Sequence, residues 1–146
     1  MFTKFIIIST FLMVVFSNTV MADIAIVGNP DENVGDLTAA NVRKLFLGER
    51  QSFPSGLHAT PINHAAGSPD RKKFFSLVLS MGESNHNRHW KRKRSTSISN
   101  SPIEVNSYDE LLEEIFSTSG AIGYIDASNV DGRVKVLLII KDYGGV

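Results

Sequence analysis

A dense basic run is the most chemically distinctive stretch of the sequence. Trp90 is followed directly by four cations: Lys91, Arg92, Lys93 and Arg94. Four adjacent cations beside an aromatic ring can bind a polyanion such as nucleic acid or lipopolysaccharide phosphates, with an affinity that falls steeply as salt rises. The same pattern is also typical of a helix whose tryptophan packs into the core while its charges lie on a solvated face. The sequence leaves both interpretations open.

Other polar groups offer little for metal binding or catalysis. His86 and His89 are three residues apart, which places two imidazoles on one helix face, but no further ligand has suitable spacing. Asp126, Asn129 and Asp131 do not follow the ligand spacing of a calcium loop and are typical of turns. The chain has no cysteine and no Gly-x-Ser-x-Gly motif. The sequence therefore predicts no enzyme, no metal site and no cofactor.

The elements that must position these residues follow from the spacing of apolar residues. Apolar runs predict strands over residues 24–27, 121–125 and 134–140, and a weaker strand over residues 58–63, which contains Pro61. Helical spacing predicts helices over residues 38–47, 69–81 and 108–119, and a polar helix starting near residue 84 carries the basic run. Strands that alternate with helices indicate one α/β domain.

Ser68, Pro69 and Asp70 have the residue types of a helix start. A serine hydroxyl accepts a backbone N–H at the N-cap, proline has a suitable φ at the first helical position, and an acid is favoured near the positive end of the helix dipole. Ser107 and Glu110 have the spacing of a capping box at another helix start. Helix capping alone is therefore one explanation of these residues.

The first 22 residues have the features of a secretory signal. A lysine precedes an apolar run over residues 5–16, and the small residues that follow predict cleavage between Ala22 and Asp23. A run of about twelve apolar residues is too short for a bilayer, which needs about twenty. We therefore expect residues 1–22 to be a cleaved signal peptide and residues 23–146 to be one exported domain without a membrane span. An export signal without cysteines is typical of a bacterial periplasm.

The charge of the exported part excludes little by itself. Removal of Lys4 with the signal leaves fourteen basic and fifteen acidic residues. A nearly neutral total does not indicate binding to nucleic acid or to a membrane surface.

Four segments resemble, in this order, the phosphate-type substrate-binding proteins of ABC transporters. They are residues 24–30 (IAIVGNP), 37–48 (LTAANVRKLFLG), 61–74 (PINHAAGSPDRKKF) and 120–124 (GAIGY). Their order and spacing are more specific than any single segment. Members of that family have two α/β lobes and about twice this length. The resemblance therefore implies a single lobe of a type II periplasmic-binding-protein-like fold, with a mixed sheet flanked by helices.

The resemblance also implies where an anion would bind. In the family, an arginine begins a short loop that ends in Ser-Gly-Thr at a helix N-terminus, and the hydroxyls and free N–H groups there hold phosphate. Here Ser68 matches the serine, while His64, Pro69 and Asp70 stand at the arginine, glycine and threonine positions. The implied donors are the Ser68 hydroxyl and the N–H groups of Asp70 and Arg71. Arg71 is then the expected countercharge.

Three functional hypotheses follow. The first is an exported, non-catalytic domain of the phosphate ABC transporter substrate-binding type that binds phosphate or a similar small oxyanion. The second is an envelope protein–protein interaction module that has lost ligand binding and forms a homodimer or binds another envelope protein, because a lone lobe exposes the surface that a second lobe would cover. The third is polyanion binding through residues 91–94.

Overall fold

The structure is a computed structural model that describes residues 22–96 and 101–144. Apart from Ala22, the predicted signal peptide lies outside the described residues. None of the helices in the described part of the chain is long and apolar enough to cross a bilayer. In chain order the elements are β1 (Ile24–Gly28), α1 (Ala39–Phe46), β2 (Thr60–His64), α2 (Pro69–Phe74), the π-helical turn η1 (Phe75–Leu79), α3 (Glu83–Thr96), β3 (Ile103–Val105), α4 (Tyr108–Ser117), β4 (Ala121–Asp126), the 3-10 turn η2 (Ala127–Asn129) and β5 (Lys135–Ile140).

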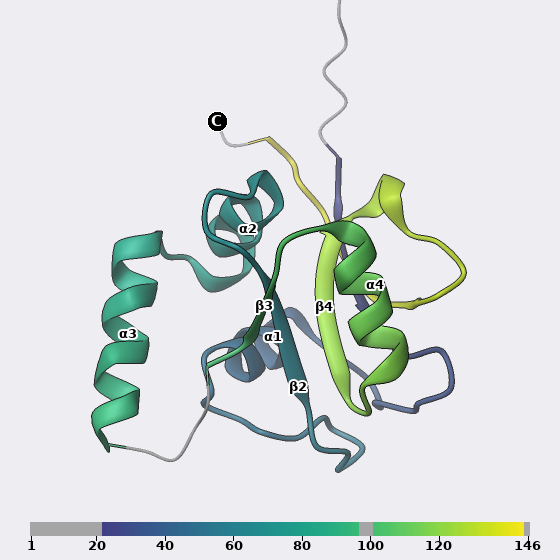
Figure 1. The fold of residues 1–146 in the computed structure, drawn as a ribbon, viewed down its shortest axis with the longest axis horizontal. Coiled ribbons are helices and arrows are strands. Elements are labelled where there is room, and N and C mark those ends of the chain that lie inside the picture. The colour runs from purple at the N-terminus through teal and green to yellow at the C-terminus, as the bar shows by residue number, and fades with distance from the viewer. Residues whose placement is uncertain (1–21, 97–100, 145–146) are drawn as a thin grey trace, which may run out of the picture.

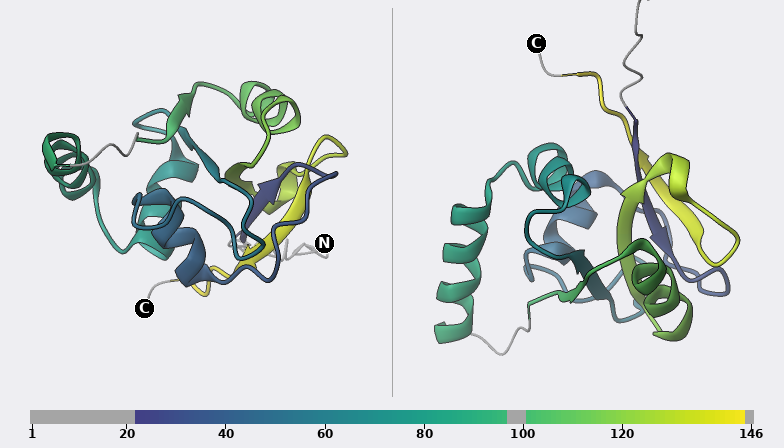
Figure 2. Two further views of the ribbon diagram at one scale, coloured as in Figure 1. Left: turned by 90° about the horizontal axis from the view of Figure 1, so that it is seen from below. Right: turned by 45° about the horizontal axis from the view of Figure 1, so that its top comes forward.

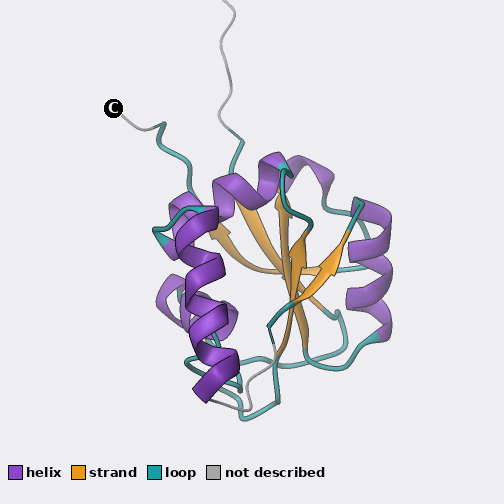
Figure 3. Ribbon diagram, turned by 60° about the vertical axis from the view of Figure 1, so that its left-hand side comes forward, coloured by secondary structure: helices purple, strands orange, loops and turns teal. Residues whose placement is uncertain are grey.

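The strands form one mixed sheet in the order β3-β2-β4-β1-β5 (Figure 1). β2 is parallel to both β3 and β4, whereas β1 is antiparallel to both β4 and β5. Helices lie on both sides of the strands, with α4 on one face and α1 and α2 on the other (Figures 2 and 3). The predicted α/β fold with a mixed sheet flanked by helices is confirmed.

Alternation along β1 explains how the sheet joins two hydrophobic clusters. Ile24 and Ile26 face the cluster formed with α1, α2 and η1, while Ala25 and Val27 face the cluster formed with α4. Side chains point to opposite faces at successive strand positions, so a strand buried on both faces has no polar residues. β1 is accordingly buried along its whole length.

Pro61 is tolerated inside the sheet because the pairing of β2 with the neighbouring strand β3 begins only after it. The N–H of Thr60 donates to the carbonyl oxygen of Gly120, on the β4 side of β2. The nitrogen of the next residue, Pro61, therefore faces the β3 side, where pairing begins only at Ile62. The sheet therefore loses no hydrogen bond through the lack of an N–H at Pro61.

Three local predictions need correction. The predicted helix over residues 69–81 consists of α2 and the π-helical η1, and it ends at Ser80, whose φ of 54° is left-handed, two residues before Gly82. The three-residue β3 was not predicted, because so short a strand depends on pairing with β2. At the start of α4, Ser107 accepts the N–H of Glu110, but the Glu110 carboxylate accepts the N–H of Asn106 instead of completing a capping box.

Candidate functional site

A cleft lies where the parallel strands β2 and β3 end. Ligands of α/β sheets bind outside the carboxyl ends of strands, at the starts of the following helices. Here α2 follows β2 and α4 follows β3, and the two helix starts border one cavity of about 480 Å³. Its lining residues are His64, Ala65, Ala66, Ser68, Pro69, Val105, Asn106, Ser107 and Tyr108.

The two N-cap serines give this cleft its hydroxyl groups. The Oγ of Ser68 accepts the N–H of Arg71 at 3.4 Å, and the Oγ of Ser107 accepts the N–H of Glu110 at 3.1 Å. Each hydroxyl uses its oxygen in this way and keeps its own hydrogen for donation. The cleft is therefore bordered by two hydroxyl donors and by the positive ends of two helices.

Asp70 follows the lining residue Pro69 and is hydrogen-bonded to Tyr108, another residue of the lining. Its Oδ2 accepts the hydroxyl of Tyr108 at 2.7 Å and the backbone N–H of Asp126 at 3.1 Å. Burial and the hydrogen bond to Asp70 raise the pKa of Tyr108 to about 12, so its hydroxyl stays protonated and continues to donate. Asp70 thus joins the starts of α2 and α4 to the end of β4.

His64 is buried at the floor of the cleft. Its Nε2 lies 2.7 Å from the carbonyl oxygen of Tyr124, and because a carbonyl can only accept, the ring proton is on Nε2. The His64 ring also meets the rings of Tyr108 and Tyr124 edge-on, at centroid distances of 5.8 and 4.9 Å. These contacts hold the imidazole in place.

Arg71 does not line the cleft, although it is next to Asp70 in the sequence. The residue is 2% exposed, and its guanidinium binds Glu83 at 2.6 and 3.0 Å, Glu104 at 2.9 Å and the carbonyl oxygen of His64 at 2.7 Å. Burial opposes its charge, but the hydrogen bonds to both carboxylates prevail and raise the pKa of Arg71. The structure therefore brings His64 and Ser68 to the cleft, holds Asp70 next to it through Tyr108, and places the Arg71 charge among carboxylates.

The basic run is divided by the geometry of α3. Trp90 is 3% exposed, which confirms that its ring is buried, and a Cβ on Gly48 would come within 2.8 Å of that ring. Lys93 donates to the carbonyl oxygen of Gly48 at 2.8 Å, whereas Lys91 and Arg94 line a separate groove. The four cations are therefore not equivalent.

His86 and His89 do not converge on a common point. The Nε2 of His89 donates to the carbonyl oxygen of Leu47 at 2.7 Å, while His86 is buried against the ring of Phe75. In residues 22–96 and 101–144, no group of three or more histidine, aspartate or glutamate side chains is placed to hold a metal ion.

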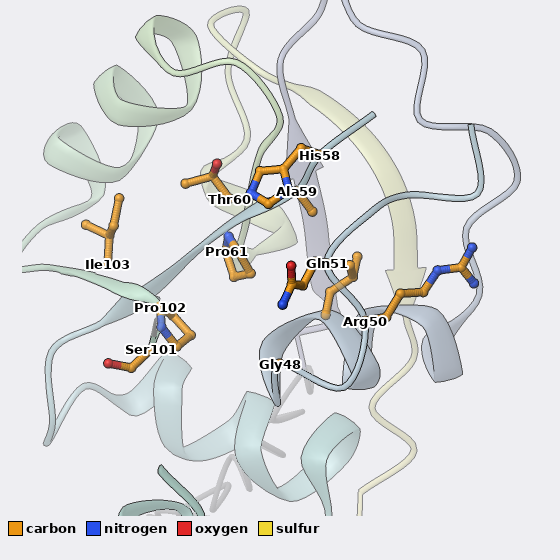
Figure 4. Close-up of a pocket in the computed structure, with 11 residues that line it drawn as sticks. Gly48, Arg50, Gln51, His58, Ala59, Thr60, Pro61, Ser101, Pro102 and Ile103 are labelled. Carbon is orange, nitrogen blue, oxygen red and sulfur yellow. The ribbon is translucent and has the colours of Figure 1, made fainter. Parts of the chain in front are cut away.

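A third cavity, of about 350 Å³, lies at the opposite end of β2 (Figure 4). Gly48, His58, Pro61 and Pro102 are among its lining residues, and the side chain of Arg50 extends away from the two prolines. The Nε of Arg50 donates to the carbonyl oxygen of Ser52 at 2.9 Å. Among the described residues that line this cavity, no set of charged side chains converges, so the cleft at the other end of β2 is the stronger candidate.

The sequence analysis missed the contribution of α4 to the cleft. Ser107 was recognised as a helix cap, but nothing related it to Ser68, and Tyr108 was not singled out. A usable signal was present, because each cap follows a strand and carboxyl ends of parallel strands meet at one edge of a sheet. That inference needed β3, which was not predicted.

Comparison with solved structures identifies the fold. Similar structures are a putative phosphate ABC transporter substrate-binding protein from Clostridium perfringens with bound phosphate (TM-score 0.64, 18% identity, 80% of this chain and 44% of that one) and an ABC-type phosphate transport receptor from Vibrio cholerae (0.63, 20%, 80% and 45%). PstS from Borrelia burgdorferi is also similar (0.55, 18%, 73% and 41%). No protein-family model and no curated protein matches the chain.

These matches confirm the resemblance to phosphate-type substrate-binding proteins at the level of the fold. The chain spans less than half the length of the structures it matches, which corresponds to one lobe.

Proposed function

We propose that residues 23–146 are an exported, non-catalytic binding domain that holds a small oxyanion, such as phosphate, in the cleft between the starts of α2 and α4. The observation that carries this proposal is that two N-cap hydroxyls, from Ser68 and Ser107, line a single cavity at the carboxyl ends of β2 and β3. The secretory features of residues 1–22 support export to a periplasm.

The proposed donors are few and come from the helix starts. The hydroxyls of Ser68 and Ser107 are joined by the backbone N–H of Asp70, which has no hydrogen-bond partner within the described residues. Pro69 has no N–H, and the N–H of Arg71 is already bound to Ser68. Both helix dipoles favour negative charge at this place.

The surrounding charges make this proposed binding weak. Asp70 and Asp109 lie in the first turns of α2 and α4 and repel an incoming anion. Arg71 contributes little countercharge, because its guanidinium is neutralised by Glu83 and Glu104. We therefore expect a dissociation constant on the order of 1 mM, which corresponds to about 4 kcal/mol.

Calorimetry of the protein without residues 1–22 tests this proposal with phosphate and sulfate. Replacement of both Ser68 and Ser107 by alanine should weaken binding by at least about tenfold, because two hydrogen bonds to a charged ligand are lost. Ser117→Ala is the matched control, since Ser117 lies at the other end of α4 and donates to the carbonyl oxygen of Glu113. Circular dichroism shows whether the variants remain folded. Absence of measurable binding at millimolar anion would refute the proposal.

A second candidate function is protein–protein interaction through β5. This strand is last in the sheet and pairs only with β1, so its other edge has no partner in the described part of the chain. Val136 and Ile139 on this strand are 42% and 39% exposed. An unpaired strand edge with exposed apolar side chains is suited to pairing with a second copy. Light scattering should then detect a dimer that Val136→Lys disrupts, and a monomer at all concentrations would contradict this candidate.

A further inference from the structure

A groove of about 400 Å³ lies between α3 and the strand β3. α3 stands to one side of the sheet in Figure 1, with β3 as the nearest strand. From α3 the lining includes His86, Trp90, Lys91 and Arg94, at the i, i+4, i+5 and i+8 positions of one helix face. Glu104 of β3 lines the opposite side. The groove shares no lining residue with the cleft at Ser68.

Two of the residues that line this groove carry three buried polar atoms with no hydrogen-bond partner within the described residues. They are both ring nitrogens of His86 and the indole nitrogen of Trp90. His86 is 5% exposed and Trp90 is 3% exposed, so exposure to bulk water does not compensate either side chain. Each unsatisfied buried group costs about 1–3 kcal/mol, and native proteins contain few of them. A bound molecule that supplies the missing partners would remove this cost at all three atoms.

The types of these atoms define what the bound molecule must offer. The indole N–H of Trp90 can only donate, so it needs an acceptor oxygen. A neutral imidazole has one N–H donor and one acceptor nitrogen, so His86 needs an acceptor and also a hydrogen to accept. His86 is neutral at pH 7, because burial and the positive charge of Arg71 lower its pKa to about 4. A ligand that satisfies Trp90 and His86 must therefore offer at least two acceptor atoms and one O–H group.

The charges of the groove favour an anion. Lys91 and Arg94 line it, and neither has an ion-pair partner in the described part of the chain. The two other charged groups of the lining, Arg71 and Glu104, bind each other at 2.9 Å, and Glu83 binds Arg71 from the outside. Two uncompensated cations thus remain beside the unpaired donors.

We propose that this groove is a second ligand site, which binds a small oxyanion that carries one hydroxyl hydrogen. The acceptor oxygens of the ligand bind the N–H groups of Trp90 and His86, its O–H donates to the remaining nitrogen of His86, and Lys91 and Arg94 balance its charge. Hydrogen phosphate and small hydroxycarboxylates such as glycolate share this chemistry. Sulfate has the same acceptors without the hydrogen, so it distinguishes the role of the acceptor nitrogen.

The single tryptophan of the chain provides a local probe of this site. The protein without residues 1–22 retains every element of the described fold, and its only indole N–H signal in an NMR spectrum belongs to Trp90. The position of this signal is measured during titrations with phosphate, glycolate and sulfate at constant ionic strength. We expect a saturable shift with phosphate, glycolate or both, and a dissociation constant for sulfate that is at least about tenfold higher, since sulfate leaves one buried group unpaired.

Variants separate the groove from the rest of the surface. Replacement of Lys91 and Arg94 by glutamine should weaken the titration about tenfold, whereas Arg92→Gln, a change on the same helix outside the lining, should leave it unchanged. Ser68→Ala with Ser107→Ala should also leave it unchanged, so failure of the cleft proposal does not affect this one. The proposal is overturned if none of the three anions gives a saturable shift, as for a groove filled by water. It is likewise overturned if Arg92→Gln weakens binding equally, as for a nonspecific polyanion surface.

Discussion

His86 should make the stability of this protein depend on pH between about 4 and 6.5. Its side chain is 5% exposed, lies 4.4 Å from the ring centre of Phe75 and makes no hydrogen bond within the described residues. Burial, followed by the charge of Arg71, lowers its pKa from 6.5 to about 4. At about 1.4 kcal/mol for each pH unit, this difference corresponds to about 3 kcal/mol of folding free energy.

The sign of the effect follows from which state binds the proton. Between pH 6.5 and about 4, the imidazole is protonated in the unfolded chain and neutral in the folded one. Acidification across this range therefore favours the unfolded state. The contribution of His86 is complete above pH 6.5, is lost as the pH falls towards 4, and changes no further below that value.

Urea unfolding of the parent protein and of His86→Gln over this pH range measures the contribution. The difference between their free energies of unfolding should shift by about 3 kcal/mol in favour of the variant on acidification. Carboxylates whose pKa is lowered in the folded state, such as Asp126 and Glu83, contribute less folding free energy at low pH. This loss occurs in both proteins, so it largely cancels in the difference between them. Buffers without phosphate or hydroxycarboxylates are needed, because a ligand in the groove would stabilise the folded state.

His58→Gln is the matched control, since His58 is exposed and lies outside the groove. The same measurement on this variant gives the effect of removing a histidine that is not buried. Parallel pH profiles for the parent protein and His86→Gln would refute the reasoning, because they would mean that His86 titrates alike in the folded and unfolded states.

Two further changes test the framework around the site. Gly120→Ala should destabilise the fold by about 4 kcal/mol or more, because φ is 71° and the new Cβ would lie 1.9 Å from the carbonyl oxygen of His58. Gly67 also has a positive φ, of 90°, but a Cβ there would enter open space. Gly67→Ala should therefore cost only about 1–2 kcal/mol in urea unfolding. Arg71→Met should cost about 1–2 kcal/mol, because it removes the partner of Glu83 and Glu104, whose carboxylates are 42% and 56% exposed and stay solvated, and an unchanged midpoint would show that this cluster contributes nothing.

Much of the fold was predictable from the sequence because the relevant information is local. The alternation in β1 and the helical spacing of Val42, Leu45 and Phe46 each place apolar residues on a face that must be buried. The caps Thr38 and Ser68 act on backbone groups three residues away, so residue type and spacing were sufficient to predict them.

Only the tertiary structure decided which side chains share a site. Arg71 follows the helix start that was predicted to hold an anion, yet its partners, Glu83 and Glu104, lie 12 and 33 residues further along the chain. Ser68 and Ser107 reach one cleft only because β2 and β3 are neighbouring parallel strands. The sequence by itself thus determined most of the elements and the caps Thr38 and Ser68, since these depend on near neighbours, and the order of four segments along the chain indicated one lobe of a binding-protein fold. Where the charged side chain of Arg71 points was decided by partners that only folding brings together.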